Sequence, residues 1–137
     1  MIDVSEYIGL PFAPGGRGPR YDCWGIVRRV YADHLGIELP LHTGYADTLT
    51  DDTSRLMVAG RADWREVADP EPYDVVMFNV DGRPNHIGLV IGDGWMLHAT
   101  RHKDACIERY RGIYSQDRIE GFYRYDHDCR PPEPGSL

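Results

Sequence analysis

The sequence predicts an α+β fold in which N-terminal helices pack on an antiparallel β-sheet. Up to Gly36 the apolar residues follow a helical period, whereas the second half consists of short β-branched and aromatic runs between turn residues. Helix first and antiparallel strands afterwards is the layout of an α+β domain. The chain has 137 residues, 42% of them hydrophobic, which suffices for one domain with a core.

An amphipathic helix is predicted from Trp24 to Leu35. Its apolar residues recur at spacings of one, three and four, and Gly36 fits the C-terminal cap. Cys23 therefore stands at a helix N-terminus. The apolar positions are Ile26, Val27, Val30, Tyr31 and Leu35.

Weaker signals surround this helix. Residues 3–6 can cap a short helix, which Gly9 and Pro11 should stop, and a Gly/Pro/Arg loop follows at residues 14–20. Residues 50–59 read as a second helix ended by a glycine. Its expected role is packing or cover on the substrate side.

Five short strands are expected to form an antiparallel meander. Turn residues such as Asp81-Gly82 and Gly92-Asp93-Gly94 separate them. The domain should span residues 1–126, since residues 127–137 form a Pro-rich tail that cannot continue a sheet or helix. The strands are Tyr73–Val80, His86–Ile91, Trp95–Ala99, Cys106–Tyr110 and Arg118–Tyr125.

Composition excludes several classes of function. A net charge of -7 argues against nucleic acid as a partner. No apolar stretch approaches the roughly 20 residues that span a bilayer, so no membrane contact is expected. The N-terminus lacks the basic and apolar regions of a signal peptide, which predicts a chain without an export signal that is made in the cytoplasm. Three cysteines are too few for a disulfide scaffold.

Cys23 is the principal candidate for chemistry. Unpaired N–H groups and the positive end of the dipole at a helix start favour a thiolate, which is the nucleophilic form of cysteine. The alternative is a small buried apolar residue, since cysteine is often buried without any reactive role.

His86 and His98 lie on adjacent predicted strands, and the turn between them decides whether they share a face. A three-residue Gly92-Asp93-Gly94 loop makes the numbers of paired residues sum to 186, which puts both imidazoles on one face. A two-residue Asp93-Gly94 turn makes the sum 187 and, without a bulge, separates them. A Cys facing a His that a second polar group orients is the arrangement of thiol acyl-transfer enzymes.

Five motifs in order carry a resemblance to a known family. Over residues 7 to 100 the chain resembles the NlpC-type cell-wall cysteine peptidases, and it is similar to stand-alone members encoded among phage and prophage tail genes. The motifs are Ile8-Gly9-Leu10-Pro11-Phe12, Asp22-Cys23-Trp24-Gly25-Ile26-Val27, Asp74-Val75-Val76-Met77-Phe78, His86-Ile87-Gly88-Leu89-Val90-Ile91-Gly92 and Met96-Leu97-His98-Ala99.

The resemblance implies a papain-like fold reduced to its core. It implies Cys23 as nucleophile, His86 as general base and then acid, and His98 as the residue that orients His86. The implied reaction is hydrolysis of the D-γ-glutamyl–diamino acid amide in peptidoglycan stem peptides, with no cofactor and no metal. The implied location is a phage tail that acts at the cell wall, beside tail-tip assembly proteins.

Three residues are expected on the substrate side. In the family the position of Asp22 contacts substrate, although an N-terminal helix cap explains the same residue. Phe12 stands where the family usually has Tyr, and Trp24 stands where it usually has Ser. Trp24 either packs in the core, the alternative we favour, or forms a wall of the cleft.

Two other readings of the same residues stay open. The chain could be a catalytically silent structural module of a tail, or an acyltransferase or amidase that uses the same triad on another amide. The remaining candidates are weaker: Cys106 reads as a strand core residue and Cys129 belongs to the tail. His98 and His102 lack the helical acid that a zinc hydrolase would use.

Overall fold

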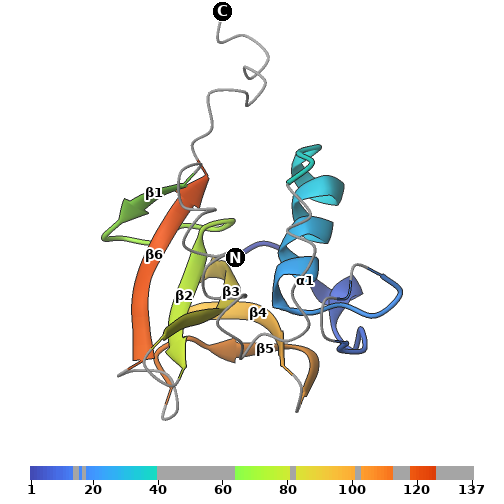
Figure 1. Cartoon of the computed structure of the whole chain (residues 1–137). Coiled ribbons are helices and arrows are strands. Elements are labelled where there is room, and N and C mark those ends of the chain that lie inside the picture. Colours follow the sequence, from blue (N-terminus) through green and yellow to red (C-terminus); the bar gives the residue numbers. More distant parts are fainter. Residues whose placement is uncertain are drawn as a thin grey trace, which may run out of the picture.

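A six-stranded antiparallel sheet with one main helix against it forms the body of the protein (Figure 1). It is seen in a computed structural model, which describes residues 1–13, 16, 18–39, 64–80, 83–100, 103–112 and 118–125. The predicted α+β class is confirmed. The predicted helix at residues 50–59 and the tail at residues 127–137 lie outside the described residues.

The strand order is β1-β6-β2-β3-β4-β5. The predicted meander is confirmed from β2 to β5, but β6 is not the next strand along the sheet, because it returns to pair with β2. Strand β1, which pairs with β6 at the sheet edge, was not predicted. The strands are β1 (Trp64–Val67), β2 (Val75–Val80), β3 (Arg83–Gly92), β4 (Trp95–Thr100), β5 (Lys103–Arg109) and β6 (Ile119–Tyr125).

The predicted amphipathic helix forms over its whole length, with a change of pitch. It begins as the α-helix α1 (Cys23–Val30) and widens into the π-helical turn η2 (Tyr31–Leu35). Gly36 ends it in the left-handed conformation, φ 66°, as the C-cap signal predicts. The helix expected near residues 3–6 is a short 3₁₀ turn, η1 (Ser5–Tyr7).

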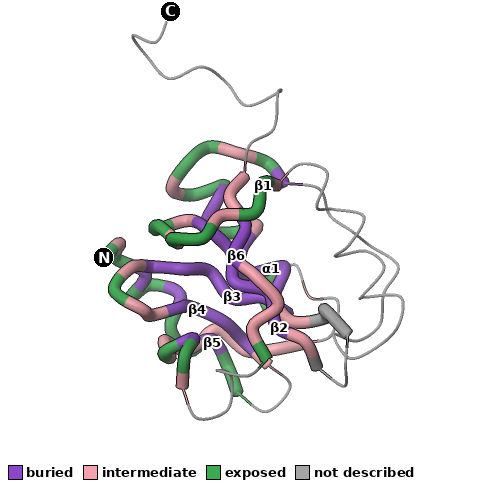
Figure 2. The backbone as a smooth tube through the Cα atoms, turned by 90° about the vertical axis from the view of Figure 1, so that its left-hand side faces the viewer, coloured by how far each residue is buried: buried purple, intermediate pink, exposed green. Residues whose placement is uncertain are grey.

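The two faces of the sheet carry separate apolar clusters, because successive side chains of a strand point to opposite sides. The first cluster joins α1 to the sheet, and includes Ile26 and Val27 on the helix with Ile87, Leu89 and Leu97 on the strands. Figure 2 shows buried stretches in the middle of β3 and of β4. The second cluster consists of Val76, Phe78, Val90, Met96, Tyr110 and Phe122.

The N-terminal segment is hydrogen-bonded to the sheet at two places. The N–H of Ile2 donates to the carbonyl of Ile91 at 2.9 Å. Further on, Gly9 donates to the carbonyl of Ala105 at 2.8 Å and Ala105 donates back to that of Leu10 at 2.9 Å. The segment that leads to Cys23 is therefore fixed to β5.

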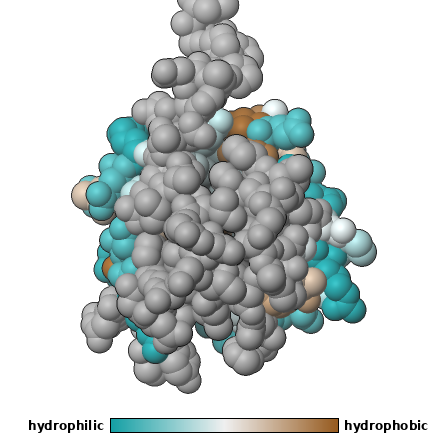
Figure 3. All heavy atoms as spheres, viewed as in Figure 1, coloured by the Kyte–Doolittle hydropathy of each residue, from teal (hydrophilic) through white to brown (hydrophobic). Residues whose placement is uncertain are grey.

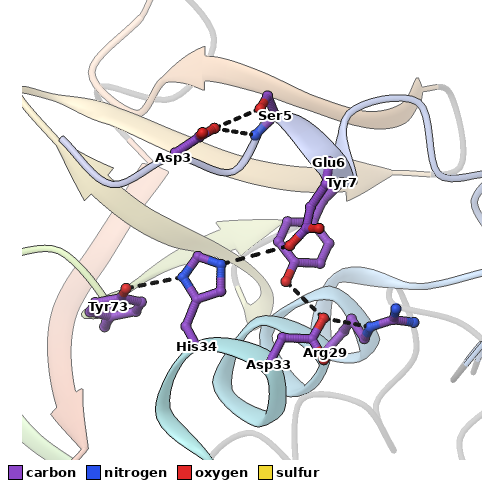
Figure 4. Close-up of polar contacts among 8 residues, drawn as sticks. All are labelled: Asp3, Ser5, Glu6, Tyr7, Arg29, Asp33, His34 and Tyr73. Carbon is purple, nitrogen blue, oxygen red and sulfur yellow. Dashed lines mark hydrogen bonds and ion pairs between the residues drawn. The ribbon is translucent and has the colours of Figure 1, made fainter.

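A polar network ties η2 to that same segment (Figure 4). The Tyr7 hydroxyl donates to Asp33 at 2.8 Å, and Asp33 also accepts from Arg29 at 2.8 Å. Nδ1 of His34 lies 3.0 Å from the Tyr73 hydroxyl, while its Nε2 lies 3.9 Å from Glu6. These contacts hold the end of the helix against the start of the chain.

The described surface is mostly polar. At the margins of the view in Figure 3 the coloured residues are largely hydrophilic. Among the described residues, the exposed large hydrophobic side chains are Met1, Ile8 and Leu35. None of the described helices has the length and apolarity that crossing a bilayer requires.

Candidate active site

Cys23 is the first residue of α1, as predicted. Asp22 caps the helix, since its Oδ1 accepts a hydrogen bond from the N–H of Gly25 at 2.7 Å. The thiol is reduced and the residue is buried, with 1% of its surface exposed. Cys23 therefore stands at the positive end of a capped helix, where a thiolate is stabilised.

Gly25 lets the preceding loop approach this helix start. A Cβ at Gly25 would lie 2.2 Å from the carbonyl oxygen of Gly16, a contact that no side chain tolerates. The same carbonyl accepts the N–H of Asp22 at 3.3 Å. A glycine two residues after Cys23 is thus required by the close packing of the loop on the first helical turn.

The hairpin between β3 and β4 combines the two turns considered from the sequence. Gly92 pairs with Trp95 across a two-residue turn, which gives the sum of 187. A register shift then follows, and Val90 pairs with Met96 at the sum of 186. The bulge thus restores the register that places His86 and His98 on one side of the sheet.

The two imidazoles are in contact, with Nε2 of His86 lying 3.0 Å from Nδ1 of His98. The prediction that they share a face is confirmed. The prediction that this face is the one toward α1 is wrong for these strands, because Ile87, Leu97 and Ala99 occupy the helix side. His86 stacks instead on Phe78 of the second cluster, with ring centroids 5.7 Å apart.

Glu108, which was not among the predicted site residues, extends this pair. Its Oε1 lies 2.9 Å from Nε2 of His98. His98 pairs with Cys106 across β4 and β5, so Glu108, two residues further on, projects on the same side. Register arithmetic extended by one strand would have found it. The three side chains form a continuous row, which we call the His86–His98–Glu108 relay.

The carboxylate fixes where the protons of the relay sit. A carboxylate can only accept, so Nε2 of His98 carries a proton, and in a neutral ring its Nδ1 is then an acceptor. Nε2 of His86 must donate to it, which leaves Nδ1 of His86 unprotonated. Nδ1 of His86 has no hydrogen bond to any residue within the described ranges. The relay therefore presents a basic nitrogen at its end.

The electrostatics favour this neutral state. Burial and the neighbouring His98 lower the pKa of His86 well below its usual range. Burial also lowers the pKa of His98, against the opposing effect of Glu108. Both rings are consequently neutral near pH 7, which a general base requires.

Glu108 itself remains ionised. Burial raises its pKa, but hydrogen bonds from Lys103 and His98 outweigh this and bring it down to about 2. Nζ of Lys103 lies 2.9 Å from Oε1.

Cys106 also lies beside the relay, because its thiol donates to Oε1 of Glu108 at 3.4 Å. The residue is half-buried, so the prediction that Cys106 is a core residue of its strand is wrong.

The residues expected on the substrate side lie in different environments. The carboxylate of Asp22 is fully buried as the helix cap. Trp24 is 9% exposed and packs edge-on against Trp64, which supports the core alternative. Phe12 is half-buried against the first cluster, and its N–H donates to Asp104 at 3.2 Å. Substrate contacts by these residues remain predictions.

Fold and site together define a class. An α+β domain with a thiol at a helix start, packed on strands that carry a histidine relay, has the groups needed for thiol-dependent acyl transfer. The family follows from comparison of sequences: the model of the NlpC/P60 family matches residues 9–124, and the chain belongs to that family. The resemblance seen in the motifs is confirmed at this level.

Relatives in this family are named as hydrolases. The chain is 26% identical over 135 residues to the gamma-DL-glutamyl hydrolase of Bacillus subtilis, covering 96% of this chain and 30% of the relative. It is 24% identical over 119 residues to a murein DD-endopeptidase and LD-carboxypeptidase of Escherichia coli, covering 86% and 57%. The expectation of an enzyme of the peptidase class is confirmed, although the chain spans only part of each relative.

Solved structures show the same fold. A Staphylococcus aureus protein of the NLP/P60 family, similar to a lipoprotein, matches with a TM-score of 0.67 at 21% identity, covering 90% of this chain and 39% of that one. The NlpC/p60 domain of the peptidoglycan hydrolase SagA matches with a TM-score of 0.58 at 21% identity, covering 87% and 89%.

Proposed function

We propose that this chain is a cysteine endopeptidase that hydrolyses peptidoglycan stem peptides, with Cys23 as nucleophile. The observation that carries the proposal is the relay, because it leaves Nδ1 of His86 as an unprotonated base. A module without turnover has no need for both a thiol at a helix start and a histidine base whose tautomer is fixed in this way.

Acylation begins with proton transfer from the Cys23 thiol to Nδ1 of His86. The thiolate attacks the amide carbonyl carbon and forms a tetrahedral oxyanion. His86 then gives the proton from Nδ1 to the amide nitrogen, the C–N bond breaks and a thioester remains on Cys23. Throughout, Nε2 of His86 keeps its proton and donates a hydrogen bond to Nδ1 of His98, while Glu108 stabilises the transient positive charge.

Deacylation repeats the sequence with water. Nδ1 of His86 takes a proton from a water molecule, the resulting hydroxide attacks the thioester carbon, and the C–S bond breaks. The sulfur leaves as a thiolate that takes the proton back from His86. The products are a carboxylic acid and an amine, and the enzyme is regenerated.

The thiol and His86 must meet at the margin of the sheet, since His86 points away from the residues packed under α1. Support comes from a register shift next to His86: Phe78 pairs with His86, but Asn79 pairs with Pro84. Bulges of this kind redirect side chains and are common beside active sites. The contacts of α1 with β3 and β4 bring the helix to the same two strands.

The substrate class rests on the relatives. One relative is named a gamma-DL-glutamyl hydrolase, which points to a γ-glutamyl amide, and another is named a murein DD-endopeptidase, which points to the cell wall. We propose the D-γ-glutamyl–diamino acid amide as the bond cleaved. An amidase or acyltransferase on another amide would use the same groups.

Mass spectrometry of purified muropeptides incubated with the protein and with Cys23→Ala tests the proposal. Stem peptides cut at the D-γ-glutamyl bond by the wild type alone would support it. Equal products from both proteins, or no cleavage by either, would refute it. A labelling rate of Cys23 with iodoacetamide no faster than that of a free thiol would favour the silent module.

We propose in addition that the enzyme acts from a phage tail, beside tail-tip proteins. The support is the similarity to tail-encoded members and the net charge of -7, which gives no attraction to a wall rich in carboxylates. Placement by an assembly would replace that attraction. Mass spectrometry of purified phage particles from the source bacterium tests this, and absence of the chain from them would contradict it.

A further inference from the structure

Three side chains around the outer end of the relay have the chemistry of metal ligands. His98, Cys106 and Glu108 each offer one ligand atom, and these atoms all lie within 4.8 Å of one another. A neutral imidazole, a thiolate and a carboxylate are together a donor set suited to zinc. We propose that Zn²⁺ binds these three residues and, by binding, switches the relay to the wrong tautomer.

The geometry is close to what zinc needs. Zinc bonds of about 2.0–2.3 Å in a tetrahedron put ligand atoms roughly 3.3–3.8 Å apart. Oε1 of Glu108 lies 2.9 Å from Nε2 of His98 and 3.4 Å from Sγ of Cys106. Small side-chain shifts suffice, because the Cα partners His98 and Cys106 are held in register across β4 and β5.

The surroundings also fit. The imidazole of a metal-bound histidine normally donates its other N–H to a partner, and Nδ1 of His98 already faces His86 at 3.0 Å. Lys103 opposes binding, since its ammonium contacts Glu108 at 2.9 Å. That side chain is 54% exposed and flexible, so it can move into water. Binding also requires loss of the Cys106 proton to solvent, so the affinity for zinc should rise with pH.

The effect on the base follows from counting protons. Zinc takes the lone pair of Nε2 on His98, so the proton of that ring must sit on Nδ1. Nδ1 then donates to Nε2 of His86, which must accept, and the proton of His86 moves to its own Nδ1. That nitrogen can no longer take the Cys23 proton. This consequence for turnover rests on the proposed function, whereas metal binding does not.

Cobalt spectroscopy tests binding without any substrate. In full-length Cys23→Ala, where the nucleophile cannot contribute, Co²⁺ should give a thiolate charge-transfer band that saturates at one ion per chain and disappears when Zn²⁺ displaces it. Cys106→Ser in that background should abolish the band and weaken zinc binding at least about tenfold. Cys129→Ser is the matched control and should keep both.

Glu108→Gln gives a second measurement that keeps the sulfur. It should weaken zinc binding by a similar factor in calorimetry, with circular dichroism reporting that the variant is folded. A band that survives Cys106→Ser, or zinc affinity unchanged in both variants, would overturn the site.

Turnover tests the switch separately. Zn²⁺ should inhibit muropeptide cleavage reversibly, a chelator should restore it, and Cys106→Ser should need at least about tenfold more zinc for the same inhibition. If zinc binds at Cys106 but turnover is undiminished, the proposed switch is refuted while the metal site stands. A protein with no turnover would refute the proposed function, while the cobalt result would still decide the metal site.

Discussion

Oε1 of Glu108 lies 2.9 Å from Nε2 of His98, and this contact determines the protonation of both histidines. The carboxylate accepts the His98 proton, which makes His98 an acceptor and His86 a donor toward it. A side chain on β5, two strands away from β3, thus decides which nitrogen of His86 is basic. Glu108 is a positioning residue, since it acts through His98.

Removal of Glu108 should slow catalysis without unfolding the protein. We expect Glu108→Ala to lower kcat about ten- to hundredfold, the order of loss seen when a metal-bound histidine loses its hydrogen-bond partner. Glu108→Gln should recover part of this, because an amide oxygen can still accept the proton. Muropeptide kinetics measure it. Equal kcat in the wild type and Glu108→Ala would show that the relay ends at His98.

Substitution of Cys23 or His86 should be more damaging than substitution of His98. Cys23→Ala and His86→Ala should each abolish turnover, since nucleophile and base act as a unit. His98→Ala should retain more activity, because an orienting residue is partly replaceable. Single-turnover cleavage of one muropeptide compares all three. A His98→Ala protein as inactive as His86→Ala would mean that His98 itself takes part in the proton transfer.

Stability should fall as the pH is lowered from 7 to 5. The folded-state pKa of His86 lies below its ordinary value of 6.5, so the unfolded chain binds a proton first as the pH falls. The neutral ring is favoured in the fold, and its stabilising effect is present above pH 6.5. Urea unfolding at both pH values should show a smaller loss for His86→Gln. An equal loss would exclude His86 as the source.

Trp24→Ser should cost stability. The indole is 9% exposed and packs on Trp64, so its removal should lower the free energy of unfolding by about 3–5 kcal/mol. Cleavage specificity should be unchanged. Thermal melting and a muropeptide panel measure both. Phe12→Tyr is the companion variant: restoration of the family hydroxyl should change rate or preference and leave the melting temperature as it is.

Gly25→Ala should displace the helix start that holds Cys23. The new methyl group would lie 2.2 Å from the carbonyl oxygen of Gly16, and this backbone atom must move. We expect a loss of about 1–3 kcal/mol in unfolding free energy and slower alkylation of Cys23. Gly112→Ala is the control, since its Cβ would meet ordinary contact at 3.4 Å. Identical behaviour of the two variants would contradict the close packing of the loop.

Local signals predicted the parts of this fold that depend on neighbouring residues. The capped helix at Cys23, its end at Gly36 and the four-strand meander all arise from short-range period and turn chemistry. The pairing of β6 with β2 and the short edge strand β1 depend on contacts between residues far apart in the sequence, and no local sequence signal specifies those contacts.

The site shows the same division. Parity along the hairpin predicted that His86 and His98 share a side, but it could not say which side faces the helix. That depends on whether the odd- or even-numbered residues pack under α1, which is a property of the whole core. Glu108 was missed because its role exists only once β5 is in register with β4.

β5 is the edge strand of the sheet, and an edge strand has unpaired N–H and C=O groups that can pair with another protein chain. Here part of the N-terminal segment occupies some of these groups, through the hydrogen bonds that join Gly9 and Leu10 to Ala105. The stretch that leads to Cys23 therefore also guards the strand that bears Glu108 against unwanted self-association. A chain truncated before Leu10 would expose the unpaired edge of β5 and would also hold the segment before Cys23 less firmly.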